Sequence, residues 1–124
     1  NTILHYIIAC DMIYPTKERG QPMNAQFKKG ALEICVLSQL AQGDKYGYEL
    51  TERISEEMSI ASGTLYPILR KLKADEYVTT YLVESESGPA RKYYKLTEKG
   101  YRYQEELLKE WKEFIEAVER LISR

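Results

Sequence analysis

Cationic side chains gather at two places in this sequence, and their setting suits the chemistry of phosphate binding. Arg70, Lys71 and Lys73 stand in a segment, residues 62–73, that contains no acidic residue. Its Leu and Ile residues recur at helical spacing, which predicts a helix with an apolar inner side and a cationic outer side. Arg91 and Lys92 open a second, tyrosine-rich segment. Because phosphate groups attract Lys and Arg, both segments are candidate contacts for nucleic acid.

The predicted helix also carries neutral side chains that can reach phosphates or base edges. We expect Ser62 or Thr64 to cap its first turn, and Pro67 suits that turn because no N–H is needed there. Hydroxyl groups of Thr64 and Tyr66 can bind phosphate, and Arg or Lys can bind guanine. The predicted DNA-contacting residues are Ser62, Thr64, Tyr66, Arg70, Lys71, Lys73, Arg91 and Lys92.

Two β-prone segments after this helix predict a hairpin. Residues 77–84 are rich in β-branched and aromatic side chains, and residues 91–96 are expected to return as the second strand. Gly88 and Pro89 are expected at the tip of the hairpin. A helix followed by a two-stranded hairpin with a basic rim is typical of a winged helix-turn-helix.

Two further helices must position this helix and hairpin. Residues 24–42 repeat apolar side chains at helical spacing and are expected to stop at Gly43, and residues 47–58 carry a second amphipathic pattern. Asp44 and Lys45 between them are expected to form a short turn. The expected fold is mainly α with a small β-hairpin: a winged helix-turn-helix followed by a long C-terminal helix.

The C-terminal helix is expected from about residue 98 to 123, with Thr97 as its N-terminal capping residue. Its apolar residues alternate three and four apart, which is typical of a coiled-coil seam and favours packing against a second copy of the chain. Packing within its own domain is the alternative. The predicted dimer-contact residues are Leu107, Leu108, Trp111, Phe114, Ile115, Val118, Leu121 and Ile122.

Length and charge fit one small domain with a local basic surface. A chain of 124 residues can bury a single core, and its net charge of −1 does not by itself indicate nucleic acid. DNA responds to a local patch rather than to the sum of charges.

Residues 1–22 differ from the rest, so we expect an N-terminal extension there, with Met23 as the native start. Residues 23–97 would form the DNA-binding domain and residues 98–124 the dimerisation helix.

Little in the sequence supports catalysis or metal binding. The only histidine is His5, and the two cysteines, Cys10 and Cys35, belong to no CxxC pair. The sequence has no GxGxxG or Walker pattern and no convincing nucleophile with a base, so we expect neither an enzyme nor a cofactor. Cys35 stands on an apolar helical face, where an inert buried thiol is expected. Unpaired cysteines and the lack of a long apolar run predict a cytoplasmic protein with no membrane span.

From about Phe27 to Leu121 the chain resembles the PadR family of bacterial transcriptional regulators, in its smaller subfamily with a single C-terminal helix. The resemblance implies a winged-helix dimer that represses an operator and releases it on binding a small molecule. Two places depart from the family pattern: Glu76 replaces a common Gly, and the wing residues Gly88–Lys92 lack the first Arg of the family's Gly-Arg-Pro-Arg-Lys. The matching blocks are Gly30–Glu33, Tyr46–Leu50, Gly63–Leu69, Arg91–Thr97, Gly100 and Trp111.

The sequence therefore predicts a dimeric regulator that binds double-stranded DNA at a palindromic operator, with half-sites set one helical turn or a multiple apart. Trp111, in the seam, is the candidate contact for a flat aromatic effector; plain core packing is the alternative. A second hypothesis is a winged-helix module that binds protein rather than DNA, which the near-neutral net charge favours. Loss of DNA affinity on replacing Arg70 or Arg91 by Ala would separate the two.

Overall fold

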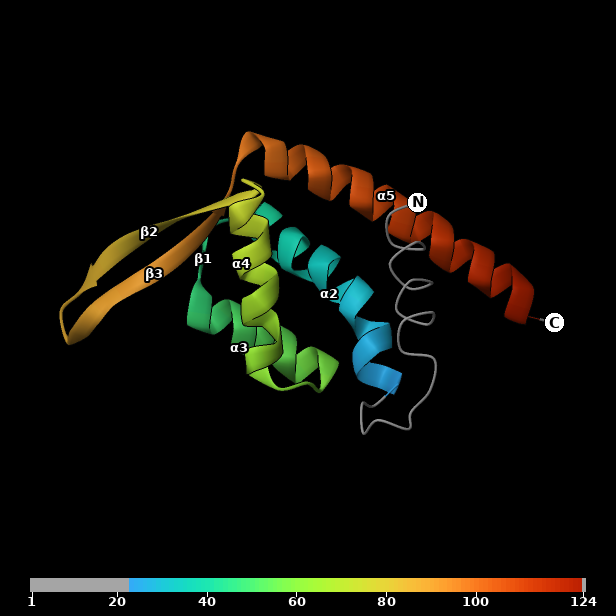
Figure 1. The fold of residues 1–124 in the computed structure, drawn as a ribbon, viewed down its shortest axis with the longest axis horizontal. Coiled ribbons are helices and arrows are strands. Elements are labelled where there is room, and N and C mark those ends of the chain that lie inside the picture. Colours follow the sequence, from blue (N-terminus) through green and yellow to red (C-terminus); the bar gives the residue numbers. More distant parts are fainter. Residues whose placement is uncertain (1–22, 124) are drawn as a thin grey trace.

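The computed structural model describes residues 23–123 and contains a helical body from which a β-hairpin projects (Figure 1). The hairpin, which we call the wing, consists of β2 and β3 and points away from the helices. The expected fold class is confirmed. The elements in chain order are α2 (Met23–Ala41), β1 (Lys45–Tyr46), α3 (Gly47–Met58), a 3-10 turn (Ser62–Leu65), α4 (Tyr66–Ala74), β2 (Val78–Ser85), β3 (Gly88–Leu96) and α5 (Glu98–Ile122).

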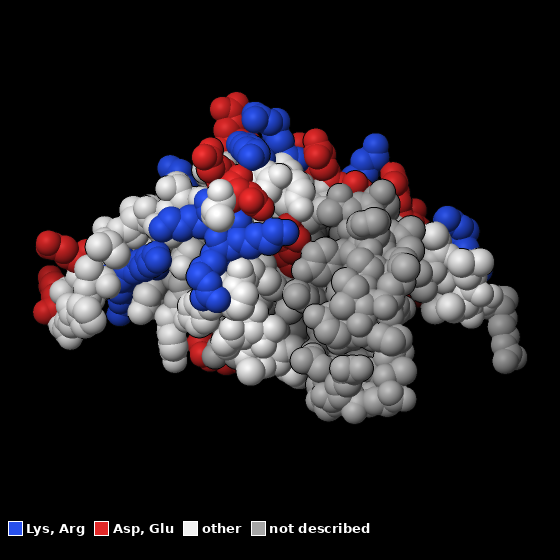
Figure 2. All heavy atoms as spheres, viewed as in Figure 1, with Lys and Arg blue, Asp and Glu red and all other residues white. Residues whose placement is uncertain are grey.

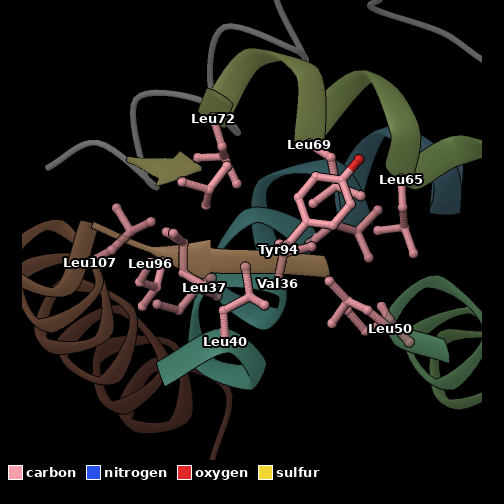
Figure 3. Close-up of a cluster of buried hydrophobic side chains, with 14 residues drawn as sticks. Val36, Leu37, Leu40, Leu50, Leu65, Leu69, Leu72, Tyr94, Leu96 and Leu107 are labelled. Atoms are coloured by element: carbon pink, nitrogen blue, oxygen red, sulfur yellow. The ribbon is translucent and has the colours of Figure 1, made fainter. Parts of the chain in front are cut away.

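One hydrophobic core joins the described helices to the base of the wing (Figure 3). Leucines of α4 and of the 3-10 turn before it point inward at the spacing predicted from the sequence, and Leu65, Leu69 and Leu72 are each at most 2% exposed. Figure 3 shows the ring of Tyr94 rising from β3 toward α4, between Leu69 and Leu65. The core therefore fixes the angle at which α4 meets the wing.

The sheet has three antiparallel strands in the order β1-β3-β2. The expected turn at Asp44 and Lys45 is wrong in part, because Lys45 pairs with Tyr94 and Tyr46 pairs with Tyr93. A two-residue strand leaves no alternation in the sequence, so only the pairing with β3 defines it.

The tip of the wing lies two residues earlier than the sequence predicted. Ser85 pairs with Gly88, so Glu86 and Ser87 make the turn, and Gly88 and Pro89 belong to β3. Pro89 is tolerated there because, among the described residues, only β2 lies beside β3 at that point. The N–H that proline lacks is therefore not needed for a hydrogen bond to a second neighbouring strand.

The N-terminal end of α4 also differs from the expectation. A 3-10 turn leads into the helix, and Leu65 occupies the position before its first residue. Leucine has no polar side chain, and none of the described side chains forms a capping hydrogen bond at this end of the helix. The predicted capping role is therefore wrong for Thr64, and the side chain of Ser62 lies outside what the structure describes. Pro67 occupies the first turn, as predicted, where its missing N–H costs nothing.

Helix α5 is fastened at its N-terminal end. Its predicted cap is confirmed, because the Thr97 hydroxyl accepts a hydrogen bond from the Gly100 N–H at 3.0 Å. Farther along, the Tyr103 hydroxyl donates to Glu33 at 2.7 Å, and burial together with this bond raises the pKa of Tyr103 well above its usual range. The first turns of α5 are thus locked against α2.

The apolar stripe of α5 divides into two parts. Leu107 is 2% exposed and belongs to the core of its own chain, so it stabilises the protomer rather than an interface. Leu108 and Trp111 pack against that core while half-buried. Beyond them the stripe becomes exposed: Ile115 at 40%, Leu121 at 85% and Ile122 at 70%.

In the described part of the chain, none of the helices has the length and apolar character needed to cross a membrane.

Candidate nucleic-acid interface

The outer side of α4 is a short cationic surface. Arg70, Lys71 and Lys73 are exposed, while the leucines on the opposite side hold the helix in the core. Lys71 and Lys73 fall in the last turn, where positive charge is favoured by the helix dipole. Among the neutral candidates, Thr64 is exposed and Tyr66 is 39% exposed; the side chain of Ser62 lies outside what the structure describes.

Tyr94 links α4 to the wing. Burial raises the pKa of its phenol, the neighbouring Tyr66 phenol raises it further, and the Arg70 guanidinium acts in the opposite direction. The Lys92 ammonium lies 5.7 Å from the centre of the Tyr94 ring, within the range of a cation–π contact. Tyr66, Arg70 and Lys92 therefore all lie near enough to interact with one buried tyrosine, at the junction of helix and hairpin.

The two adjacent cations of β3 lie on opposite faces of the sheet. Side chains alternate along a strand, and residues paired across strands share a face. Lys92 pairs with Leu82 and shares the face of Tyr94, which we call the inner face because it meets α4. Arg91 pairs with Val83 on the outer face, with its guanidinium 5.0 Å from the centre of the Tyr46 ring.

The outer face also carries a row of tyrosines that the sequence analysis did not single out. Tyr46, Tyr93 and Tyr81 stand side by side across β1, β3 and β2. The rings of Tyr81 and Tyr93 stack with centres 5.6 Å apart, and those of Tyr46 and Tyr93 lie 5.9 Å apart. The many tyrosines were visible in the sequence, but their alignment depends on the strand register.

Charge is distributed unevenly over this side of the molecule. Figure 2 shows Lys and Arg side chains gathered over α4 and the adjoining part of the wing, with acidic side chains at the wing tip. The tip acids include the exposed residues Glu84 and Glu86. A local basic surface thus exists despite the near-neutral total, and it ends before the tip of the wing.

Comparisons with known proteins decide the family. The sequence model of the transcriptional regulator PadR-like family matches residues 36–106. The chain belongs to this family. Members of the PadR-like family are transcriptional regulators.

Solved PadR-like structures share both fold and sequence with this chain. A PadR-like transcriptional regulator from Bacillus cereus has a TM-score of 0.72 and 33% identity, covering 80% of this chain and 98% of its own. A PadR-like transcription factor from Bacteroides fragilis has a TM-score of 0.64 and 38% identity, covering 82% and 99%. PadR from Bacillus subtilis, solved in complex with operator DNA, has a TM-score of 0.55 and 27% identity, covering 62% and 46%.

A curated relative is also similar to this chain in sequence. An uncharacterized protein from Lysinibacillus sphaericus is 34% identical over 95 residues, which cover 73% of this chain and 87% of that protein. The family model and the solved PadR-like structures confirm the resemblance to PadR regulators that the sequence motifs indicated.

This PadR-like chain also contains a pocket between α2, α3 and α5. Its volume is about 390 Å³, and Trp111, the candidate effector contact, forms part of its wall. Cys35 lies beside it as a free, half-buried thiol, and burial raises the pKa of that thiol. The lining is mainly apolar with a few polar groups, which is the usual make-up of a small-molecule site. It consists of Ile34, Cys35, Ser38, Gln39, Arg53, Ile54, Glu57, Met58, Leu108 and Trp111.

Proposed function

We propose that this PadR-like regulator binds double-stranded DNA as a homodimer at a palindromic operator, and that it acts as a repressor. The observation that carries the proposal is the cationic side of α4, with Lys92 held beside it on the inner face of the wing. An exposed helix of this kind can enter the major groove while the wing contacts the flanking backbone. The operator complex of the Bacillus subtilis relative supports this use of the fold.

The proposal assigns unequal roles to the predicted DNA-contacting residues. Arg70, Lys71 and Lys73 would contact DNA from α4, with Ser62, Thr64 and Tyr66 at the entry to the helix. Lys92 would contact DNA from the wing because it shares a face with Tyr94. Arg91 would contribute less, since it lies on the outer face against Tyr46.

A labelled duplex from upstream of this protein's own gene provides the test. Fluorescence anisotropy against a scrambled duplex at about 0.15 M salt should show selective binding, roughly a thousandfold or more. Arg70→Ala and Lys92→Ala should each weaken binding and reduce the salt slope by about one, because each removes one phosphate contact.

Matched controls separate these effects from a general loss of charge. Arg91→Ala should weaken binding less than Lys92→Ala. Arg102→Ala should leave binding unchanged, because Arg102 lies on α5 and makes an exposed pair with Glu98 at 3.5 Å. Equal binding of the two duplexes by the unmodified protein would contradict the DNA proposal and favour a protein partner for the winged helix.

We further propose that a flat aromatic effector binds at Trp111 and releases the operator. Support comes from the pocket that this indole helps to line, at the point where α5 leaves the core. Because Trp111 is the only tryptophan of the chain, its fluorescence reports binding directly. Titration with planar aromatic compounds should quench this fluorescence and release the duplex at the same concentrations. Release of the duplex from Trp111→Ala at the same effector concentrations as from the unmodified protein would leave core packing as the role of this residue.

A further inference from the structure

A hydrogen bond joins the wing to a turn far away in the sequence. The Tyr81 hydroxyl of β2 donates to Asp44 Oδ2 at 2.6 Å, across 37 positions of the chain. Asp44 stands between α2 and β1, so this bond connects the wing directly to the helical body. The bond to the carboxylate, which favours the neutral phenol, raises the pKa of Tyr81.

The bond lies at the last row where the sheet has three strands. Tyr46, Tyr93 and Tyr81 form that row on the outer face, with the Arg91 guanidinium over the Tyr46 ring. Among the described residues, β1 pairs only with Tyr93 and Tyr94. From there to the tip, the wing is a two-stranded ribbon, which has little stability or fixed direction of its own.

Exposure along β2 agrees with this division. Tyr81 is 40% exposed, Leu82 69% and Val83 40%, so packing on the described part of the body contributes little beyond the row. The direction of the ribbon must therefore be set at the row itself. Lys92 lies on the opposite face, one residue closer to the tip of the wing than Tyr93.

We propose that Asp44 and Tyr81 are positioning residues that hold the wing at a fixed angle, so that Lys92 stays beside α4. Neither residue needs to touch DNA, because Tyr81 lies on the outer face of the sheet and Asp44 is its hydrogen-bond partner. The role in DNA binding rests on the proposed function, whereas the bracing of the ribbon does not.

Amide hydrogen exchange of the full chain, followed by NMR without DNA, tests the brace. Tyr81→Phe keeps the ring stack and removes only the donated hydrogen bond. Amides of β2 and β3 beyond the row should exchange about threefold to tenfold faster, the effect of losing one hydrogen bond. Tyr101→Phe is the matched control, since Tyr101 is equally exposed at 41% but lies on α5. Unchanged wing exchange in Tyr81→Phe would overturn the proposal.

Replacement of Asp44 provides a second, independent variant. Asp44→Asn keeps an oxygen that can accept from Tyr81 and should retain most of the protection, whereas Asp44→Ala should match Tyr81→Phe. Equal protection in Asp44→Ala and the unmodified protein would also overturn the brace.

A double-mutant cycle with Lys92 tests the positioning role. Tyr81→Phe should weaken operator binding about threefold to tenfold when Lys92 is present and hardly at all in the Lys92→Ala background. A merely structural role would give the same loss in both backgrounds, and that result would overturn the positioning of Lys92. If the unmodified protein fails to select the operator, the proposed function fails, while the exchange rates still decide whether the brace exists.

Discussion

Two neighbouring cations of β3 show how a single position decides which surface a side chain serves. Arg91 and Lys92 were predicted together as wing contacts because they are adjacent in the sequence. A strand sends consecutive side chains to opposite faces, so only Lys92 lies with Tyr94 on the side of α4. The predicted strand implied this separation, but the sequence did not say which face meets the helix.

At the residue scale, Glu76 has a left-handed backbone with φ of 64°. This conformation suits glycine, the residue common here in the family, and costs other residues about 1 kcal/mol. We predict that Glu76→Gly raises the free energy of unfolding by about 0.5–1 kcal/mol, measured by urea denaturation. The gain is reduced by the greater freedom of glycine in the unfolded chain.

Glycine introduced in a regular strand should have the opposite sign. Thr79→Gly, at an exposed position of β2 paired with Lys95, should lower stability by up to about 1 kcal/mol because glycine weakens the interior of a strand. If both variants lose stability, the left-handed backbone at Glu76 is not a source of strain.

At the element scale, α3 approaches β3 closely at Gly47. A Cβ built at this position would lie 2.8 Å from Cε1 of Tyr94 and 3.5 Å from the Lys92 carbonyl oxygen. The glycine of the segment Tyr46–Leu50 therefore lies where α3 meets the sheet. This contact could not be read from the sequence, since the two elements are more than forty positions apart.

We predict that Gly47→Ala lowers the free energy of unfolding by about 1–3 kcal/mol, because the buried Tyr94 ring must move to admit the methyl group. Urea denaturation measures the change. Gly63→Ala is the control: among the described residues, no heavy atom lies within 4 Å of its Cβ position, so its effect should stay within about 0.5 kcal/mol. Equal effects at the two glycines would contradict the close approach.

At the scale of the whole molecule, α5 leaves the body with the C-terminal part of its apolar stripe exposed, at Ile115, Leu121 and Ile122. Figure 1 shows the helix running past the ends of the other described elements. A second copy of the chain is the proposed cover, since self-packing of a heptad-like stripe buries both copies at once. The anchored part near Leu107 would then set the distance between the two α4 helices.

We predict that Leu121→Glu together with Ile122→Glu shifts the protein from dimer to monomer in sedimentation equilibrium. The melting of each protomer's core should change little, because these side chains are 85% and 70% exposed. By contrast, Leu107→Ala should cost about 2–5 kcal/mol of stability, since it empties space in the core. An unaltered dimer in the double variant would exclude this end of α5 as the interface.

The sequence by itself determined the features that depend on nearby residues. The order and type of the helices, the inward leucines of α4, Pro67 in its first turn and the Thr97 cap all follow from patterns a few positions long. Helical periodicity, capping and proline chemistry act locally, so such patterns can be recognised without knowing the fold.

Only the tertiary structure decided the features that join distant parts of the chain. It defined β1 through its pairing with β3, set Lys92 beside Tyr94, aligned the outer tyrosines and brought Tyr81 to Asp44. It also divided the stripe of α5 into a buried and an exposed part. These contacts depend on strand register and helix packing, which arise only when segments far apart in sequence share one core.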